Sequence, residues 1–263
     1  MKLTVAVSGT CAPSLALSLT LALTFCAGLA AHAEDDSLQP KLGPNAIPIT
    51  EATEHLRATP APDYWAFAPY VKPQFTTSAC GVATVSAAVN GLAGLPANAE
   101  DTVMTQPDLL EAVGNAHWSE ISAEGGDGVM FGDLVTYAAA ALPVAGLEGY
   151  GVTAFKPTDA SEATLEIIRN WLIQNEESAD DALMVYFNQG VVTGDWDGPH
   201  VSLIGAYDAA KDQVLILEVD QDWYIPYWTP TAVLLEAMLK PTSAEHGVLE
   251  GQTGGFVRLA PQS

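Results

Sequence analysis

The order of helical and strand patterns along the chain predicts an α+β fold. Apolar residues at helical spacing dominate up to about residue 175, and four strand-like segments follow after residue 181. Two of these segments are joined by a short polar turn, which is typical of an antiparallel hairpin. A helical first part followed by an antiparallel sheet is the pattern of an α+β domain.

The first 33 residues are typical of a cleaved export signal. Lys2 precedes an apolar run over 15–29, and Ala31-His32-Ala33 has the small-x-small form of a cleavage site. A membrane helix is the alternative, but the run is short and acidic residues follow it at once. We therefore expect a signal peptide over 1–33, a periplasmic or secreted protein, and no membrane association after cleavage.

The rest of the chain is expected to form one domain. Residues 34–48 are polar and interrupted by proline and glycine, which predicts an extended lead-in to a domain over 49–263. The chain has 9 Lys+Arg and 32 Asp+Glu, with a net charge of −23. This charge argues against nucleic acid or anionic lipid as a partner. The acidic residues are scattered, which favours a solvated acidic surface over a dedicated cation-binding role.

The helices before the sheet are predicted from capping residues and apolar spacing. Thr50 would cap a short helix ending at Arg57, and the aromatic residues of 59–69 would cover the core. A helix beginning at Cys80 buries Val82, Val85, Val89 and Leu92. Further predictions are a helix over 105–113, a loop over 124–128, a helix over 131–142 and an amphipathic helix over 159–175 capped by Asp159 and Glu162, with Leu165, Ile168, Trp171 and Leu172 buried.

The sheet is predicted from β-branched and aromatic runs between turn residues. Its strands would cover 182–187, 200–207, 213–220 and 255–259, with the hairpin turn at 208–212. Between the hairpin and the last strand, Thr229 as N-cap and Pro230 at the first helical position would open a helix ending at Met238.

Cys80 is the candidate nucleophile. A thiol at a helix N-terminus meets the positive end of the helix dipole and free N–H groups, which favour the thiolate. Removal of residues 1–33 would leave Cys80 as the sole cysteine, without any disulfide partner, and a free thiol in an oxidising compartment is a liability unless it is buried or used. Gln74, six residues upstream, could point an amide N–H at the same place as an oxyanion donor. A packed structural cysteine is the alternative.

The predicted hairpin supplies a candidate base. With a five-residue turn centred on Ala210, the even-numbered residues of both strands share one face, including Ala206. His200 would then face Asp220 directly or Glu218 diagonally. A carboxylate would orient the imidazole, which would take the proton of Cys80. Either acid fits this role, and a structural histidine beside solvated acids is the alternative.

Other polar clusters are weaker candidates. The loop over 124–128 lacks the lysine and the spacing of a phosphate-binding loop. The segments 117–120 and 195–197 contain possible metal ligands, but neither has a convincing partner elsewhere in the sequence. We therefore predict no metal site in the protein.

Three segments resemble the phytochelatin synthase family. They are Gln74 with 80–83 and 89–92, the stretch 198–207, and 215–219 with Tyr224, Pro226, Trp228 and 236–238. The resemblance extends from about Leu42 to Leu259. It implies a papain-like cysteine peptidase fold, in which the nucleophile helix of an N-terminal helical part packs on a C-terminal antiparallel sheet. The short chain resembles the bacterial form of the family, without the cysteine-rich second half of plant members.

The resemblance also implies an activity. The family cleaves the Cys–Gly bond of glutathione and passes the γ-Glu-Cys acyl group to water or to another glutathione, which makes phytochelatin. It implies Cys80 as nucleophile, His200 as base and then acid, and Gln74 as oxyanion donor. No tightly bound cofactor is expected, and heavy-metal ions such as cadmium or zinc would enter as thiolate complexes of the substrate.

The sequence departs from the family at several positions. Glu218 stands where the family has the aspartate of the triad, and Lys211 where an arginine is usual. Gln221 and Trp223 replace basic residues. We expect Gly81, Lys211 and Asp220 to contact substrate, while the aromatic residues 223–228 form core, cleft wall or a recognition surface for a less charged ligand. The alternatives are a cysteine peptidase for a different small peptide and a non-catalytic binder of metal or metal-thiolate. Monomer and homodimer both stay open.

Overall fold

The computed structural model describes residues 41–262, and every structural statement below concerns that part of the chain. The predicted signal peptide and residues 34–40 of the predicted lead-in lie outside the described residues. Of the lead-in, the described part ends in a two-residue strand at Ile47–Pro48. Within residues 41–262, no helix is both long and apolar enough to cross a bilayer.

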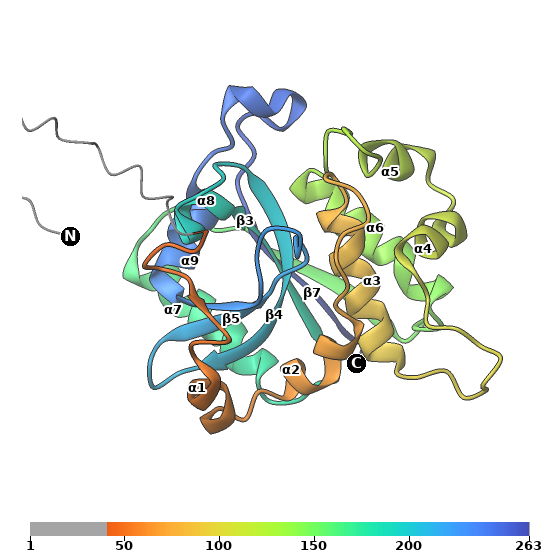
Figure 1. Cartoon of the computed structure of the whole chain (residues 1–263), viewed down its shortest axis with the longest axis horizontal. Helices are drawn as coiled ribbons and strands as arrows, with labels where there is room; N and C mark the ends of the chain where they lie inside the picture. The colour runs from red at the N-terminus through yellow and green to blue at the C-terminus, as the bar shows by residue number, and fades with distance from the viewer. Residues whose placement is uncertain (1–40, 263) are drawn as a thin grey trace, which may run out of the picture. The chain divides into compact units, whose positions relative to one another are not determined.

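A seven-stranded sheet forms the centre of the described chain, in the order β1-β6-β5-β4-β3-β7-β2 (Figure 1). Every neighbouring pair is antiparallel. The strands are β1 Ile47–Pro48, β2 Tyr150–Phe155, β3 Ala182–Asn188, β4 Pro199–Asp208, β5 Gln213–Leu217, β6 Tyr227–Pro230 and β7 Gly255–Pro261. The helices and the antiparallel sheet confirm the predicted α+β class.

Helices cover both faces of this sheet. Figure 1 shows α3 and α6 on one side and α7 and α9 on the other. The helices are α1 Thr53–Ala58, α2 Pro62–Phe67, α3 Cys80–Ala93, α4 Gln106–Val113, α5 Ala116–Ile121, α6 Phe131–Val144, α7 Glu162–Asn175, α8 Gln189–Thr193 and α9 Thr231–Leu239, with 3-10 turns η1 Ala68–Tyr70 and η2 Ala244–Leu249.

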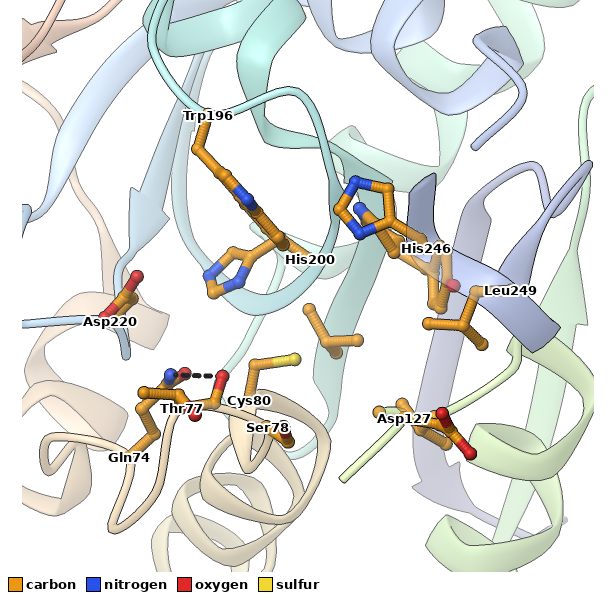
Figure 2. Close-up of a pocket in the computed structure, with 15 residues that line it drawn as sticks. Gln74, Thr77, Ser78, Cys80, Asp127, Trp196, His200, Asp220, His246 and Leu249 are labelled. Carbon is orange, nitrogen blue, oxygen red and sulfur yellow. Dashed lines mark hydrogen bonds between the residues drawn. The ribbon is translucent and has the colours of Figure 1, made fainter. Parts of the chain in front are cut away.

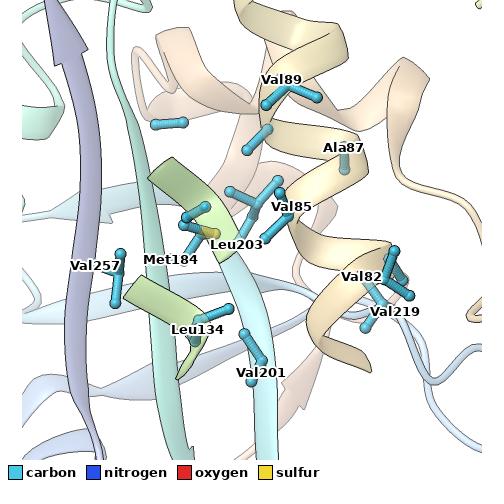
Figure 3. Close-up of a cluster of buried hydrophobic side chains, with 14 of the residues drawn as sticks. Val82, Val85, Ala87, Val89, Leu134, Met184, Val201, Leu203, Val219 and Val257 are labelled. Carbon is cyan, nitrogen blue, oxygen red and sulfur yellow. The ribbon is translucent and has the colours of Figure 1, made fainter. Parts of the chain in front are cut away.

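Two apolar cores lie on the two faces. In the first, shown in Figure 3, Val82, Val85 and Val89 of α3 pack with Leu203 of β4 and other residues of the sheet. In the second, α7 and α9 pack on the opposite face. Small residues let α3 approach the sheet closely, and Thr84 Oγ1 donates to the Val201 carbonyl at 2.9 Å. This packing holds the first residue of α3 beside the beginning of β4.

The predicted helix over 80–92 is confirmed, whereas three predicted caps are wrong. Helix α1 begins at Thr53 after Ala52, not at Thr50. In α7 the cap is Ser161, whose hydroxyl accepts from the Thr164 N–H, while Asp159 accepts from the Ser161 N–H at 2.9 Å outside the helix. Thr229 belongs to β6 and leaves Pro230 as the N-cap of α9. Only α7 therefore has a side-chain cap among these three helices, whereas α1 and α9 begin after Ala52 and Pro230 without one.

Strands β2 and β6 were missed by the sequence prediction. The β2 side chains are half-buried or exposed and show no alternation. Its strand conformation comes from pairing with β7 along the sheet edge, which local sequence does not reveal. The helices-first order is therefore incomplete, because β2 lies between α6 and α7.

The hairpin of β4 and β5 contains a bulge that the sequence did not predict. Leu203 pairs with Leu217 and Ile204 with Ile216, as expected, but Ala206 pairs with Leu215. The extra residue is Gly205. The bulge moves Ala206 into the first core, so the prediction that it shares a face with Ile204, which lies in the second core, is wrong. Strand β5 ends at Leu217, and Glu218 follows it.

Candidate active site

Four predicted residues line one pocket, although they come from two stretches of the chain that lie far apart: Gln74 and Cys80 from the first, His200 and Asp220 from the second. Gln74 comes from the loop before α3, Cys80 is the first residue of α3, and His200 is the second residue of β4. Figure 2 shows Cys80 and His200 side by side, with Gln74 and Asp220 on one side of Cys80 and Asp127 and Leu249 on the other. Glu218 contacts the His200 ring and is buried from solvent.

Glu218 fixes the orientation of the His200 ring. Its Oε1 lies 2.6 Å from His200 Nε2. The Ser202 hydroxyl is 3.1 Å from the same nitrogen. An ionised carboxylate accepts only, so Nε2 carries the proton and Nδ1 of the neutral ring keeps its lone pair. This tautomer leaves Nδ1 as the nitrogen that can accept the proton of a thiol.

The Glu218 carboxylate is satisfied on both oxygens. The Asp220 N–H donates to Oε1 at 2.7 Å, and Gln189 Nε2 donates to Oε2 at 3.0 Å. The side chain is completely buried, so these donors replace water around the charge. Burial alone would raise the pKa of Glu218, but the His200 charge and the hydrogen bonds outweigh it and lower this pKa.

The pKa of His200 moves in the opposite direction. Burial alone would lower it, but the Glu218 carboxylate, followed by the Cys80 thiol, outweighs burial and raises the pKa of His200 to about 10. The protonated ring is therefore favoured in this pocket, and an imidazolium stabilises a neighbouring thiolate.

Cys80 stands at an uncapped helix N-terminus. Ala79 occupies the N-cap position and offers no side-chain acceptor to the first N–H groups of α3. Such groups bind anions, including the oxyanion formed when a thiolate attacks a carbonyl. Cys80 is half-buried and is the free cysteine among residues 41–262. The position suits both the nucleophile and one oxyanion donor.

Gln74 supplies an amide at the same pocket. Its Nε2 donates one hydrogen to the Thr77 carbonyl at 3.2 Å, the contact drawn in Figure 2. A primary amide has a second N–H, which stays available for an oxyanion. The Gln74 Oε1 is buried and has no partner within the described residues.

The three predicted substrate contacts fare differently. Asp220 lines the pocket, and burial raises the pKa of its carboxyl. Gly81 lies behind the pocket, where a Cβ would come within 2.8 Å of Val129 Cγ1, so it lets a pocket wall approach α3. The prediction for Lys211 is wrong, because it lies in the turn at the opposite end of β4 from His200, with Nζ 3.8 Å from Asp208 Oδ2.

Several pocket residues were missed by the sequence analysis. Tyr186, Trp196 and His246 line the pocket, and the Trp196 and His246 rings meet edge to face. His246 Nε2 lies 2.7 Å from the Asp197 carbonyl. These residues come from β3, a loop and η2, and no spacing in the sequence connects them with Cys80. Their assignment depended on the tertiary structure.

A second hollow adjoins the first. It shares Gln74, Thr77, Trp196 and Asp220 and adds Lys41, Asp195, Asp197, Trp223 and Tyr224. Lys41 Nζ pairs with Asp195 at 3.1 Å and lies 4.2 Å from the centre of the Trp223 ring. Trp223 is 58% exposed, whereas Tyr227 and Trp228 are completely buried. The aromatic residues 223–228 therefore divide into cleft wall and core.

Within residues 41–262, no group of three or more His, Cys, Asp or Glu side chains has the arrangement of a metal site. His117 and Glu120 form only an exposed pair at 3.8 Å.

The pocket thus combines a half-buried thiol, a buried imidazole held by a carboxylate, and two N–H donors. This combination defines the class of cysteine-dependent acyl-transfer sites. The chain belongs to the phytochelatin synthase family, whose model matches residues 50–246. This confirms the family predicted from the sequence.

Two of the relatives are plant proteins. The chain is 27% identical over 177 residues to glutathione gamma-glutamylcysteinyltransferase 1 of Arabidopsis thaliana. The aligned residues cover 64% of this chain and 32% of that protein. It is 30% identical over 184 residues to the transferase 1 of Triticum aestivum, covering 69% and 33%. The chain thus matches about a third of the length of these relatives.

Proposed function

We propose that this protein cleaves the Cys–Gly bond of glutathione through a γ-Glu-Cys thioester on Cys80. The observation that carries the proposal is the 2.6 Å contact between His200 Nε2 and Glu218, because it leaves Nδ1 as the base at the pocket that holds the thiol. Family membership supports glutathione as the substrate. The chain matches only about a third of the length of the plant enzymes, so its own activity has to be measured.

The proposed reaction proceeds in two halves. The Cys80 thiolate attacks the carbonyl carbon of the substrate's cysteine, and the oxyanion accepts N–H bonds from Gln74 and the start of α3. The C–N bond then breaks, and the imidazolium of His200 gives its proton to the departing glycine amine. In the second half, His200 removes a proton from water or from the amine of another glutathione. That nucleophile breaks the thioester and frees Cys80.

Three further features belong to the proposal. The α+β fold, with the nucleophile at the start of α3 beside an antiparallel sheet, supports a papain-like arrangement. The export pattern of residues 1–33 supports action outside the cytoplasm. Cadmium or zinc would arrive as a thiolate complex of the substrate, since the protein needs no metal for the steps above.

A product assay tests the proposal. The protein is incubated with glutathione, with and without cadmium, and the products are identified by mass spectrometry beside a Cys80→Ala variant. Free glycine with γ-Glu-Cys, or a peptide longer by one γ-Glu-Cys unit, is expected only when Cys80 is present. Intact glutathione after prolonged incubation, with a thiol that still reacts quickly with iodoacetamide, would exclude glutathione. An unreactive thiol would favour the non-catalytic binding alternative.

A second candidate is a peptidase for a less anionic peptide. Asp127 and Asp220 line the nucleophile pocket, and Lys41, a cation at the adjoining hollow, is already paired with Asp195. Glutathione is an anion, and this surrounding acidity disfavours it. The same assay with glutathione amidated at its glycine carboxylate separates the two. Faster cleavage of the amide than of glutathione would favour the second candidate.

A further inference from the structure

We propose that Gln106 is a positioning residue for Gln74, the oxyanion donor. This inference rests on the proposed function only in that Gln74 is assigned the role of donor. Gln106 lies outside the pocket, as the first residue of α4, and its side chain is buried. Neither the pocket lining nor the sequence pattern indicates a role for it.

The Gln106 amide holds the backbone on both sides of Gln74. Its Nε2 donates to the Pro73 carbonyl at 2.8 Å, and its Oε1 accepts from the Phe75 N–H at 3.1 Å. These are the residues immediately before and after Gln74. One planar amide therefore fixes both peptide groups that flank the donor, as a neighbouring strand would.

We call the Gln106 amide, with its bonds to Pro73 and Phe75, the Gln106 clamp. The start of α4, which carries this clamp, is itself fixed. Thr105 caps α4, with its hydroxyl accepting from the Asp108 N–H at 3.3 Å and its own N–H donating to Asp108 Oδ2 at 3.1 Å. This capping box sets the backbone next to Gln106. The clamp therefore transmits the position of α4 to the 73–75 segment.

On its other side, Gln74 is tied to the segment that carries the carboxylate. The Gln74 N–H donates to the Val219 carbonyl at 2.8 Å, one residue after Glu218. The 73–75 segment is thus held between α4 and the residues that orient His200. The next residues before α3 are held by the segment 122–126 instead. The Thr77 hydroxyl donates to the Glu124 carboxylate, and the Thr76 hydroxyl donates to the Ser122 carbonyl. Loss of the Gln106 clamp would free the donor while leaving Cys80, His200 and Glu218 in place.

Two reagents separate the donor from the nucleophile. p-Nitrophenyl acetate acylates Cys80: the thiolate attacks the carbonyl, an oxyanion forms, p-nitrophenolate leaves and a thioester remains. Iodoacetamide alkylates the same thiolate by displacement of iodide, without any oxyanion. The ratio of the two rates therefore measures oxyanion stabilisation, whether or not glutathione is the substrate.

In Gln106→Met, which has similar length but no amide, we expect the acylation rate to fall about tenfold while the alkylation rate changes less than about twofold. Removal of an oxyanion donor itself lowers kcat by a factor of about 10²–10³. Gln106→Glu, which keeps an acceptor for Phe75 but places an oxygen against the Pro73 carbonyl, should show the same split. Glu111→Gln, an exposed change on α4 that touches neither the Gln106 amide nor the cap, is the matched control and should leave the ratio near that of the unchanged protein.

A double variant decides whether Gln106 acts through Gln74. In a Gln74→Ala background, Gln106→Met should have little further effect on acylation, because the donor is already absent. Equal losses in both backgrounds, or parallel losses of acylation and alkylation in both Gln106 variants, would overturn the proposal. Absence of glutathione cleavage beside a Gln106-dependent ratio would reject the proposed substrate and keep this inference.

Discussion

The Glu218 carboxylate is completely buried, and four donors surround it, including the Ser202 hydroxyl at 3.5 Å from Oε1. His200 and the Asp220 N–H share Oε1, and Gln189 holds Oε2. A buried carboxylate is tolerated only when its charge is paired and its oxygens are bonded. Glutamate fills the place of the family's shorter aspartate because Gln189 and the 218–220 turn meet its longer side chain.

Glu218→Gln should reduce kcat/KM by about 10²–10⁴, as loss of the orienting carboxylate does in other triads. The amide removes the charge that stabilises the imidazolium while keeping nearly the same shape. Glu218→Asp should retain more activity, since it keeps the charge but cannot reach both His200 and Gln189. Steady-state kinetics with glutathione measure both variants. Near-normal turnover of Glu218→Gln would contradict the assigned role.

The His200 pKa, raised to about 10, predicts the alkaline limit of activity. Cleavage needs the imidazolium to protonate the departing glycine, so the rate should persist above pH 8. It should fall only as pH rises through the raised pKa, not near the ordinary imidazole value of about 6.5. In Glu218→Gln this limit should move to lower pH. A kcat/KM profile from pH 6 to 11 checks the prediction, and a limit near pH 7 shared by both proteins would reject it.

At the scale of elements, the β4–β5 hairpin places the base against the carboxylate. The bulge at Gly205 restores the pairing of Leu203 with Leu217 after the register has shifted near the turn. A Cβ at Gly205 would lie 2.6 Å from Leu217 Cγ, and Leu217 directly precedes Glu218. The close approach of the two strands here therefore requires glycine.

Gly205→Val should lower the free energy of unfolding by about 1–3 kcal/mol through overpacking. Activity should also fall, because displacement of Leu217 moves Glu218 away from His200. Gly149→Val is the matched control, since a Cβ there meets no atom within 4 Å. Urea unfolding and the glutathione assay measure both effects. A fully active, equally stable Gly205→Val protein would show that the bulge has no role in the site.

At the scale of the whole molecule, one buried acid couples stability to pH. Asp63 is completely buried, accepts a hydrogen bond from Asn175 Nδ2, and has an unpartnered Oδ1 within the described residues. Burial, together with the Asp181 and Glu176 carboxylates, raises its pKa to about 9. The native state therefore holds a proton that the unfolded chain loses near pH 4. The free energy of unfolding should fall as pH rises from about 4 to about 9.

Asp63→Asn should remove this contribution to the pH dependence of stability. The amide keeps an oxygen for Asn175 and has no charge to bury. We expect its Tm to exceed that of the unchanged protein at pH 9 by at least about 2–4 °C, the shift that 1 kcal/mol produces at this size. The difference should shrink toward pH 5. Exposed Glu51→Gln serves as control, and identical pH slopes for Asp63→Asn and the unchanged protein would refute the assignment.

The sequence by itself determined the α+β class, the family and the helix that begins at Cys80, because these depend on local spacing and contiguous motifs. It also singled out Gln74, His200 and Glu218 as candidates. The family resemblance favoured Glu218, but Asp220 stayed open as the carboxylate of the triad, since alternation in a strand assigns a face but not a hydrogen bond. The end of β5 at Leu217 and the Gln189 contact place Glu218 against His200.

Only the tertiary structure revealed Tyr186, Trp196, His246 and the Gln106 clamp. The structure also showed that Lys211 lies away from the site, in the turn between β4 and β5. The physical reason is the same for each of these residues. Their positions depend on contacts between segments that lie far apart in the chain, including a bulge in one strand and an edge pairing of another. Side-chain periodicity reports which face of an element is buried, but not which distant element covers it.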